Sequence, residues 1–421
     1  MAAIHPIKAL RFTEKAGNIK DLVCPPYDIV SEAEKNAILD KNPENLIKLE
    51  LPLGENRYES AAKELKRMED ENIIARDEKA GIFIYRETFS SKITGEKDMT
   101  LTGMICRCSL YDFSEKIVLP HEETLTKAKA DRFELMKATY CNFSSIYSLY
   151  NDASGRIKEI QRKETEKAPI YCFEDGENVI HSLWKIEDEN TIKEIQDILA
   201  DKQLFIADGH HRYETACNFK KYCEEQGIDL EADKVLMTIV DMDDEGLLVL
   251  PTHRLIVDLD VNEKELIEKC LENFEVSEAP VELVEETLGK IGNHAFALYT
   301  GGGFVSVLKL RAEAEGRIID GRSEAYSDLD VSILHSLVLE RALGIDKQNM
   351  ANQVNLRYTR SKDEAIAAVN SGNASACFII NATKVSQIKA VALAGDKMPQ
   401  KSTYFYPKLK TGLVMNTLER G

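Results

Sequence analysis

The segment that constrains this fold most is residues 204–215, Leu-Phe-Ile-Ala-Asp-Gly-His-His-Arg-Tyr-Glu-Thr. Its four leading apolar residues predict a buried strand, Asp-Gly interrupts that strand, and residues 213–222 carry apolar side chains at helical spacing. A strand that turns directly into a helix leaves backbone N–H groups and the positive end of the helix dipole at the turn, which favours phosphate. The residues expected to bind phosphate are Asp208, Gly209, His210, His211 and Arg212. The alternative is a helix start that uses Asp208 only as its cap.

The composition is that of a soluble globular protein, with 43% hydrophobic and 30% charged residues among 421, a length that predicts two or three domains. The net charge of −18 argues against a nucleic-acid-binding surface, because neutralising phosphates requires an excess of Lys and Arg. No apolar run approaches the ~20 residues that cross a bilayer, and the start lacks a signal-peptide pattern, so we expect a cytoplasmic protein without a membrane segment. Nine cysteines without a C-x-x-C pair predict reduced, mostly buried thiols and no metal site.

Predicted helices alternate with short, often hairpin-connected strands, which indicates an α+β fold. We expect an N-terminal region over residues 1–258, with a core at about 116–225, and a C-terminal α+β region over 259–421 that covers the cleft. Strands at 81–89 and 99–110 should pair through a polar turn at Thr94-Gly95. The expected helices include 57–71, 131–140, 190–199, 262–274, 331–343 and 362–370.

The triple glycine at residues 301–303 invites comparison with a phosphate loop. A phosphate loop would continue with Gly-Lys-Ser or Gly-Lys-Thr and then a helix, whereas here a strand pattern follows. We therefore interpret this segment as a hairpin turn.

A second chemical grouping is Leu119-Pro120-His121-Glu122-Glu123-Thr124. Two adjacent carboxylates beside a histidine, in a loop after a strand, give acid–base capacity. The alternative is a solvated acidic helix start capped by Thr124 or Thr126. The spacing alone leaves both interpretations open.

Further basic residues follow strands or gather near the C-terminus. Thr252-His253-Arg254 could close a pocket from a neighbouring loop, or be a surface strand end. The C-terminal lysines are interpreted as a structural clasp, with substrate contact as the alternative; they are Lys397, Lys401, Lys408 and Lys410. The isolated histidines, among them His181 and His335, are expected to be packed or solvated.

The strand–turn–helix element resembles the Gly-Glu-Arg-Arg turn of ParB-type nucleotide-binding domains and the Gly-Cys-His-Arg turn of sulfiredoxins, which holds nucleotide phosphates. Gly209, His211 and Arg212 match the glycine, histidine and arginine of sulfiredoxins. His210 stands where sulfiredoxins have a reactive cysteine, so sulfinic-acid repair is not expected. The Pro-His-Glu segment is similar to that of the free-serine kinases of the same superfamily, and this resemblance implies that Glu122 is the catalytic base.

A further resemblance covers nearly the whole chain, which is identified as a member of a prokaryotic family catalogued as domain of unknown function number one thousand and fifteen. The segments that carry it are His5-Pro6, Ala9-Leu10-Arg11, Pro25-Pro26-Tyr27-Asp28, His121-Glu122-Glu123-Thr124, Asp131-Arg132, Asp208-Gly209-His210-His211-Arg212, Pro251-Thr252-His253-Arg254 and residues 398–407.

These resemblances imply a ParB/sulfiredoxin-like core and a nucleotide-dependent kinase that phosphorylates the hydroxyl of a small metabolite, with free L-serine giving O-phosphoserine. The expected cofactors are ATP or ADP, with CTP still open as donor, and Mg²⁺, which Glu123 or Asp208 could place through the water shell of the ion. Glu122 would act as base, with His121 and Glu123 beside it. Possible substrate or phosphate contacts are Thr124, Arg132, Thr252, His253 and Arg254. The alternative function is a nucleotide-binding or nucleotide-hydrolysing switch in a regulatory protein.

Overall fold

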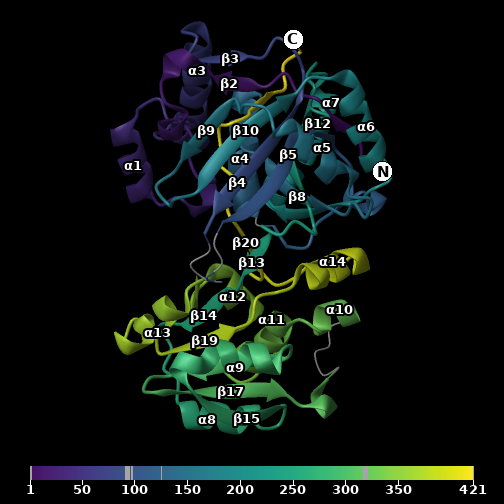
Figure 1. The fold of residues 1–421 in the computed structure, drawn as a ribbon. Coiled ribbons are helices and arrows are strands. Elements are labelled where there is room, and N and C mark those ends of the chain that lie inside the picture. Colours follow the sequence, from purple (N-terminus) through teal and green to yellow (C-terminus); the bar gives the residue numbers. More distant parts are fainter. Residues whose placement is uncertain (1, 91–94, 96–97, 125, 316–320, 421) are drawn as a thin grey trace. The chain divides into compact units, whose positions relative to one another are not determined.

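The computed structural model describes residues 2–90, 95, 98–124, 126–315 and 321–420, which form two compact units. Those within 1–120, 124–248 and 407–421 form unit 1, and those within 121–123 and 249–406 form unit 2. Both units combine helices with sheets, so the expected α+β class is confirmed (Figure 1).

Unit 1 is built on a nine-stranded mixed sheet in the order β6-β11-β8-β12-β5-β4-β10-β9, with β1 paired to β5. The pairs β11–β6 and β12–β8 are parallel, and the other pairs are antiparallel. The strands are β1 (Ile4–His5), β4 (Ile82–Phe89), β5 (Met99–Ser109), β6 (Val118–Leu119), β8 (Ile146–Tyr150), β9 (Tyr171–Glu174), β10 (Ile180–Ile186), β11 (Leu204–Asp208) and β12 (Lys234–Asp241). The expected pairing of β4 with β5 is confirmed, while Thr94 of their expected turn lies outside the described residues.

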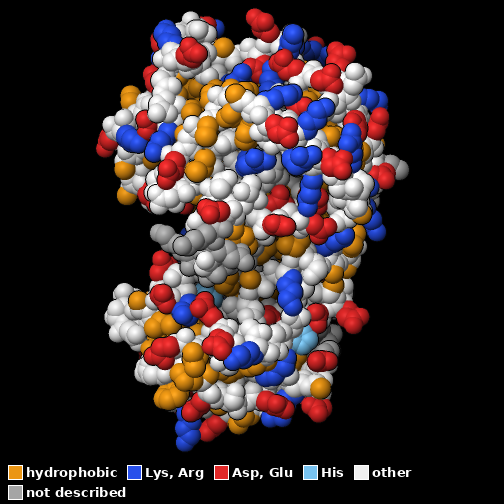
Figure 2. Space-filling view, in the orientation of Figure 1, with side chains coloured by type: hydrophobic (Ala, Val, Ile, Leu, Met, Phe, Trp, Pro, Cys, Tyr) orange, Lys and Arg blue, Asp and Glu red, His pale blue; other side chains and the backbone are white. Residues whose placement is uncertain are grey.

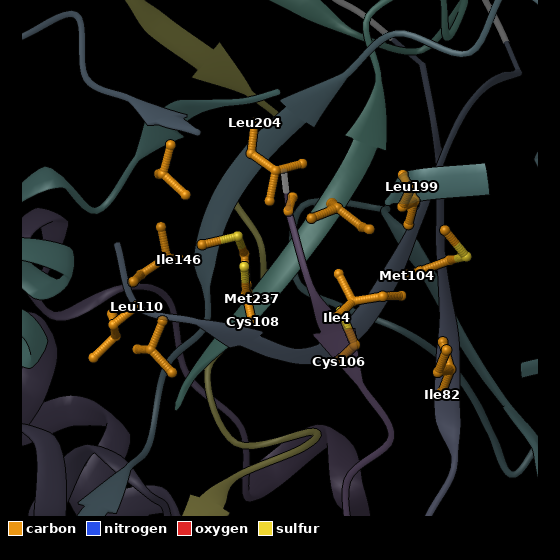
Figure 3. Packing of buried hydrophobic residues seen from close by; sticks show 14 of the residues in the cluster. Ile4, Ile82, Met104, Cys106, Cys108, Leu110, Ile146, Leu199, Leu204 and Met237 are labelled. Carbon is orange, nitrogen blue, oxygen red and sulfur yellow. The ribbon is translucent and has the colours of Figure 1, made fainter. Parts of the chain in front are cut away.

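The main core of unit 1 lies on one face of this sheet. Figure 3 shows side chains from β1, β4, β5, β8, β11 and β12 packed in one layer. Successive strand residues point to opposite faces, which places Ile82 and Ile84, or Cys106 and Cys108, on the same buried face. Residues of α4 to α7 complete the cluster; these helices are α4 (Thr126–Thr139), α5 (Arg156–Glu164), α6 (Glu189–Leu199) and α7 (His210–Gln226).

The N-terminal helices form a second core in unit 1 with two small sheets. These elements are α1 (Glu32–Lys41), α2 (Ile47–Glu50), α3 (Arg57–Asp70), β2 (Leu10–Phe12) paired with β3 (Ile74–Arg76), and β7 (Cys141–Asn142) paired with β21 (Asn416–Thr417). Ser31 caps α1 in a capping box with Glu34, as its sequence predicts.

The opposite face of the large sheet carries a buried polar cluster. His181 on β10 pairs with Glu87 on β4, and its ring nitrogens lie 2.7 Å from the Tyr85 hydroxyl and 3.1 Å from the Asp175 carboxylate. Lys410 completes the cluster with an ion pair of 2.7 Å to Asp175. Burial lowers the pKa of His181, but the bonds to Asp175 and Glu87 outweigh it and raise that pKa overall. The expectation that His181 is simply packed therefore misses a charged network.

Unit 2 is built on a six-stranded antiparallel sheet in the order β15-β17-β16-β19-β14-β18. Its strands are β14 (His253–Ile256), β15 (Phe274–Pro280), β16 (Ala295–Tyr299), β17 (Phe304–Leu310), β18 (Leu356–Thr359) and β19 (Ala376–Ile380), and β13 (Leu248–Leu250) pairs with β20 (Tyr404–Tyr406). The helices are α8 (Glu263–Cys270), α9 (Val284–Ile291), α10 (Glu324–Ser327), α11 (Asp330–Ile333), a π-helix (Leu334–Glu340), α12 (Lys347–Asn352), α13 (Lys362–Asn370) and α14 (Val385–Ala394). The hairpin predicted at residues 301–303 is confirmed, because β16 and β17 are antiparallel neighbours.

Two helices of unit 2 differ from the residue ranges that the sequence predicts. The helix expected over 262–274 ends at Cys270, because Phe274 begins β15 and pairs with Leu310. The helix expected over 331–343 divides into α11 and the π-helix. A π-helical turn accommodates an extra residue and is frequent at functional sites.

The division between the units differs from the expected boundary at residue 258. Strand β14 pairs with β18 and β19, so Thr252-His253-Arg254 belongs to unit 2. Residues 407–421 return to unit 1 through backbone bonds such as Met415 N–H to the Leu10 carbonyl. The sheet of unit 1 also contains β4, β5 and β12, which lie outside the expected core at 116–225.

All nine cysteines are free in the structure; seven are buried, Cys217 is half-buried and Cys172 is exposed, which confirms that most of them are buried. Within the described ranges, no helix is both long and apolar enough to span a membrane.

Candidate functional site

The turn between β11 and α7 lies in unit 1 and is shaped by Gly209. Helix α7 begins at His210, three residues earlier than expected, so His210, His211 and Arg212 occupy its first turn. Gly209 is the N-cap with φ of 94°, a left-handed conformation that L side chains rarely adopt. The first N–H groups of a helix lack intrahelical acceptors and carry the positive end of its dipole, so the turn favours an anion.

Asp208 does not cap this helix, so the cap interpretation is wrong. Its carboxylate accepts from Arg212 Nη2 at 2.8 Å and from Lys408 Nζ at 2.6 Å. Burial alone would raise the pKa of Asp208, but Lys408 and Arg212 hold it well below its usual range. Arg212 Nη1 also donates to the Ser145 carbonyl at 2.6 Å, so its guanidinium is fixed from two sides.

A small pocket of about 10 Å³ opens beside this turn. Its lining residues are Pro26, Ser144, Ser145, Tyr147, Asp208, Arg212, Lys408, Leu409, Lys410 and Thr411. Three cations and one carboxylate line it, together with hydroxyl groups that can donate to an anion. His210 is buried and contributes positive potential at Asp208, while His211 is half-buried.

Arg132 lies in the wall of a second cavity, which Arg212 also lines. Its Nη1 donates to the Glu50 carboxylate at 2.9 Å, and its Nε and Nη2 donate to Asp131. Its guanidinium stacks 4.2 Å from the ring of Tyr27, in the Pro-Pro-Tyr-Asp segment. Burial raises the pKa of Tyr27 to about 12. Arg132 is therefore engaged in a buried ion pair, and that second cavity is lined by both Arg132 and Arg212.

Thr124 lies just before α4, and its side chain contacts α7. Its hydroxyl donates to Glu214 at 2.7 Å, and Lys129 forms an ion pair with the same carboxylate at 2.6 Å. Sequence reasoning missed Glu214, which lies four residues after His210 and so faces the same side of α7.

His121, Glu122 and Glu123 belong to unit 2, where residues 398–403 hold them. Met398 N–H donates to the His121 carbonyl at 2.7 Å, and Lys401 N–H donates to Glu122 Oε1 at 3.1 Å. The His121 ring is buried, with Nε2 3.1 Å from the Thr403 hydroxyl. The side chain of Glu123 is 57% exposed and lies 3.9 Å from Arg322 Nη2, whereas the Glu122 carboxylate accepts the backbone hydrogen bond.

Arg254 lies next to this segment in unit 2. It is completely buried, and its guanidinium donates to the carbonyls of Thr252 and Lys401 and to His335. Burial lowers the pKa of Arg254 to about 10 and that of His253 to about 4. The surface-strand interpretation of Thr252-His253-Arg254 is therefore wrong, since all three residues are buried.

The predicted residues thus form two groups. Unit 1 contains Asp208, Gly209, His210, His211 and Arg212, with Thr124 and Arg132. Unit 2 contains His121, Glu122, Glu123, Thr252, His253 and Arg254. Sequence reasoning also left open the role of Lys408 and Lys410, which line the unit 1 cavity. Among the described residues, no group of three or more His, Cys, Asp or Glu side chains is placed to hold a metal ion.

Comparison with solved structures finds several distant similarities. A free serine kinase variant in complex with ADP is 17% identical with a TM-score of 0.36, covering 70% of this chain and 89% of that chain. A conserved hypothetical protein from Pyrococcus furiosus is 18% identical with a TM-score of 0.35, covering 70% and 92%. SbnI from Staphylococcus aureus, with a C-terminal truncation, is 9% identical with a TM-score of 0.35, covering 72% and 84%.

No curated protein matches the sequence. A family model does match, over residues 4–332, which is most of the chain and includes both groups of candidate residues. This match confirms the resemblance drawn from the sequence motifs. The chain belongs to the family described as Protein of unknown function (DUF1015).

Proposed function

We propose that this protein is a nucleotide-dependent phosphotransferase that phosphorylates the hydroxyl of a small metabolite, with free L-serine as the acceptor. The observation that carries the proposal is the cation-lined cavity beside the Gly209 turn. A ParB/sulfiredoxin-like assignment for this part of unit 1 belongs to the same proposal. ATP or ADP would place its phosphates against the first turn of α7 and Arg212.

In the transfer step, the acceptor oxygen would form a bond to the terminal phosphorus while the bond to the leaving phosphate oxygen breaks. The proton of the acceptor hydroxyl would pass to a carboxylate oxygen of Glu122. The backbone of Lys401 already orients that carboxylate, which reduces the reorganisation needed at the moment of reaction.

Mg²⁺ takes oxygen ligands and is commonly held by one or two carboxylates together with substrate phosphates. Glu123 or Asp208 could hold the ion through its water shell, since both oxygens of Asp208 already accept from Arg212 and Lys408. Bound with the nucleotide, the ion would neutralise phosphate charge. The chain's own residues would bind and orient the phosphates and remove the proton.

The test is incubation of the full chain with L-serine, Mg²⁺ and ATP, ADP or CTP, with phosphoserine detected by mass spectrometry. Glu122→Gln should lower turnover by ~10²–10⁴ while leaving nucleotide affinity nearly unchanged. Glu286→Gln is the matched control, because this carboxylate pairs with Lys290 on an exposed surface of unit 2 and should not affect turnover. Arg212→Ala should weaken nucleotide binding by roughly 1.5–3 kcal/mol in calorimetry.

Nucleotide binding without phosphorylation of any hydroxyl acceptor would favour the switch function instead. Absence of nucleotide binding would exclude both functions.

A further inference from the structure

Arg254 is a buried cation that has no carboxylate partner among the described residues. Its guanidinium donates to the His335 ring and to the carbonyls of Thr252 and Lys401. These three acceptors serve five N–H donors, and none of them carries a negative charge. Burying a charge is costly unless an opposite charge compensates it, so Arg254 favours an anion in its surroundings.

The other buried arginine of the described chain is compensated. Arg132 in unit 1 forms ion pairs with Glu50 at 2.9 Å and with Asp131 at 2.6 Å. Charges at the surface are also balanced, since acidic and basic side chains are interspersed over the face that Figure 2 draws. Arg254 therefore differs both from Arg132 and from the exposed cations.

Two residues in contact with Arg254, His335 and Tyr358, also line a pocket of about 110 Å³. One water occupies about 10–15 Å³ of such space, so the pocket holds roughly seven to eleven waters, which is room for a free amino acid as small as serine. All its described lining residues belong to unit 2. His335 and Ser336 come from the π-helix, a conformation that is frequent at functional sites.

His335 connects the buried charge of Arg254 to the pocket. Burial and the charge of Arg254 hold the pKa of His335 well below its ordinary value, so the ring is neutral. Its Nε2 accepts from Arg254 Nε at 3.4 Å, which leaves the proton of the neutral ring on Nδ1. An N–H donor polarised by a buried cation favours an anionic group in the pocket.

Arg322 adds a second cation to the pocket wall. Its Nη1 donates to the Lys397 carbonyl at 3.1 Å, and its guanidinium lies 4.7 Å from the centre of the Tyr326 ring, so it is held in place. A fixed guanidinium can bind a carboxylate through two parallel hydrogen bonds. Glu123 also lines the pocket, 3.9 Å from Arg322 Nη2, which is too long for a hydrogen bond. Opposite charges side by side in this way complement a zwitterion.

We propose that this pocket of unit 2 binds a free α-amino acid, whose carboxylate contacts Arg322 and His335 and whose ammonium group contacts Glu123. The inference rests on the proposed function in one respect, that the bound amino acid is the phosphoryl acceptor. With Glu123 engaged by the ammonium group, Asp208 is the residue that could hold Mg²⁺.

The base of the proposed function lies near the same pocket. Burial raises the pKa of Tyr358, Arg254 opposes this rise and Glu122 adds to it, so both charges act on the ring. Tyr358 lines the pocket, and Glu122 belongs to unit 2 as well. An amino acid with a hydroxyl side chain would therefore bring the reacting oxygen close to its base.

The test is calorimetry on the full chain, with and without ADP. The probes are L-serine, L-threonine, serinol, which lacks the carboxylate, and L-glycerate, which lacks the ammonium group. At least one of the two amino acids should bind about tenfold or more tightly than serinol and L-glycerate. Arg322→Gln should weaken that binding about tenfold or more.

Two further variants make the test specific. Glu123→Gln, at an exposed position that should not disturb folding, should reduce the preference for L-serine over L-glycerate. Arg311→Gln is the matched control, because this arginine of unit 2 has a similarly exposed side chain, 37% against 30% for Arg322, and pairs with Glu275 outside the pocket lining.

The outcomes separate this inference from the proposed function. Equal affinity for L-serine and serinol, wild-type amino-acid affinity in folded Arg322→Gln and Glu123→Gln, or no binding of either amino acid would overturn the pocket assignment. Phosphoserine formation in any of these cases would leave the proposed function standing, with the acceptor bound elsewhere. L-Serine bound through Arg322 but phosphorylated with no nucleotide would support the pocket and contradict the kinase.

Discussion

Gly209→Ala should both destabilise unit 1 and weaken phosphate binding, whereas Gly227→Ala, at the other end of α7, should affect stability alone. Both glycines have positive φ, 94° and 64°, where an L side chain costs about 1–2 kcal/mol. An added Cβ at Gly209 would lie 2.9–3.0 Å from three atoms of the Arg212 guanidinium, whereas at Gly227 it would meet nothing within 4 Å. Arg212 would have to move in the first variant only.

The free-energy cost of moving Arg212 in the Gly209→Ala variant can be estimated. Arg212 donates to Asp208 and to the Ser145 carbonyl, and a charge-assisted hydrogen bond contributes about 1.5–3 kcal/mol. Adding the loss of one such bond to the backbone strain gives about 2.5–5 kcal/mol for Gly209→Ala, against about 1–2 kcal/mol for Gly227→Ala. The same movement removes the guanidinium from the place where we propose that it binds phosphate.

Urea unfolding followed by tryptophan fluorescence suits this comparison, because the single tryptophan, Trp184, lies on β10 of unit 1. Calorimetry with ADP gives the effect on binding. Equal destabilisation by the two substitutions, together with equal ADP affinity, would refute the argument that Gly209 is required for the position of Arg212.

The remaining predictions concern ionisable groups. Because the pKa of His181 is raised in the folded protein, its stabilising contribution is complete below its ordinary pKa of about 6.5 and is lost as pH rises through the raised value. The stability difference between wild type and His181→Gln, measured by Trp184 fluorescence, should therefore shrink as pH rises above about 6.5, and a difference independent of pH would contradict the charged network. Cys172 should be the first thiol to react with a disulfide reagent, and Cys172→Ser should remove that fast phase. Cys108 should react only on unfolding, because burial raises its pKa to about 12.

Local features of the sequence predicted local features of the structure well. The strand ending at Asp208, the capping box at Ser31 and the hairpin at residues 301–303 depend on neighbouring residues, and all three are present. The start of α7 was placed late because polar residues at 210–212 interrupt the apolar spacing. Glycine in the left-handed N-cap conformation allows the helix to begin with those polar residues.

Long-range placement could not be predicted in the same way. Nothing near His121 in the sequence indicates that residues 121–123 pack with residues 398–403, because that contact depends on strand pairing in unit 2. Likewise, Asp208 and Lys408 are 200 positions apart and meet only because residues 407–421 return to unit 1. From the sequence we interpret these lysines as a structural clasp, but nothing near Lys408 in the sequence identifies Asp208 as its partner.

The structure also changes the roles that we expect for the residues of Asp208-Gly209-His210-His211-Arg212 in binding phosphate. Asp208 is an ionised carboxylate that fixes two cations, and a carboxylate in direct contact with phosphate would repel it. Its effect on binding is therefore expected through Arg212 and Lys408, which it holds at the cavity. Holding two cations in place before a ligand arrives lowers the entropy lost on binding, since neither side chain must then be ordered. The carboxylate and the glycine thus set the geometry, and the cations supply the attraction.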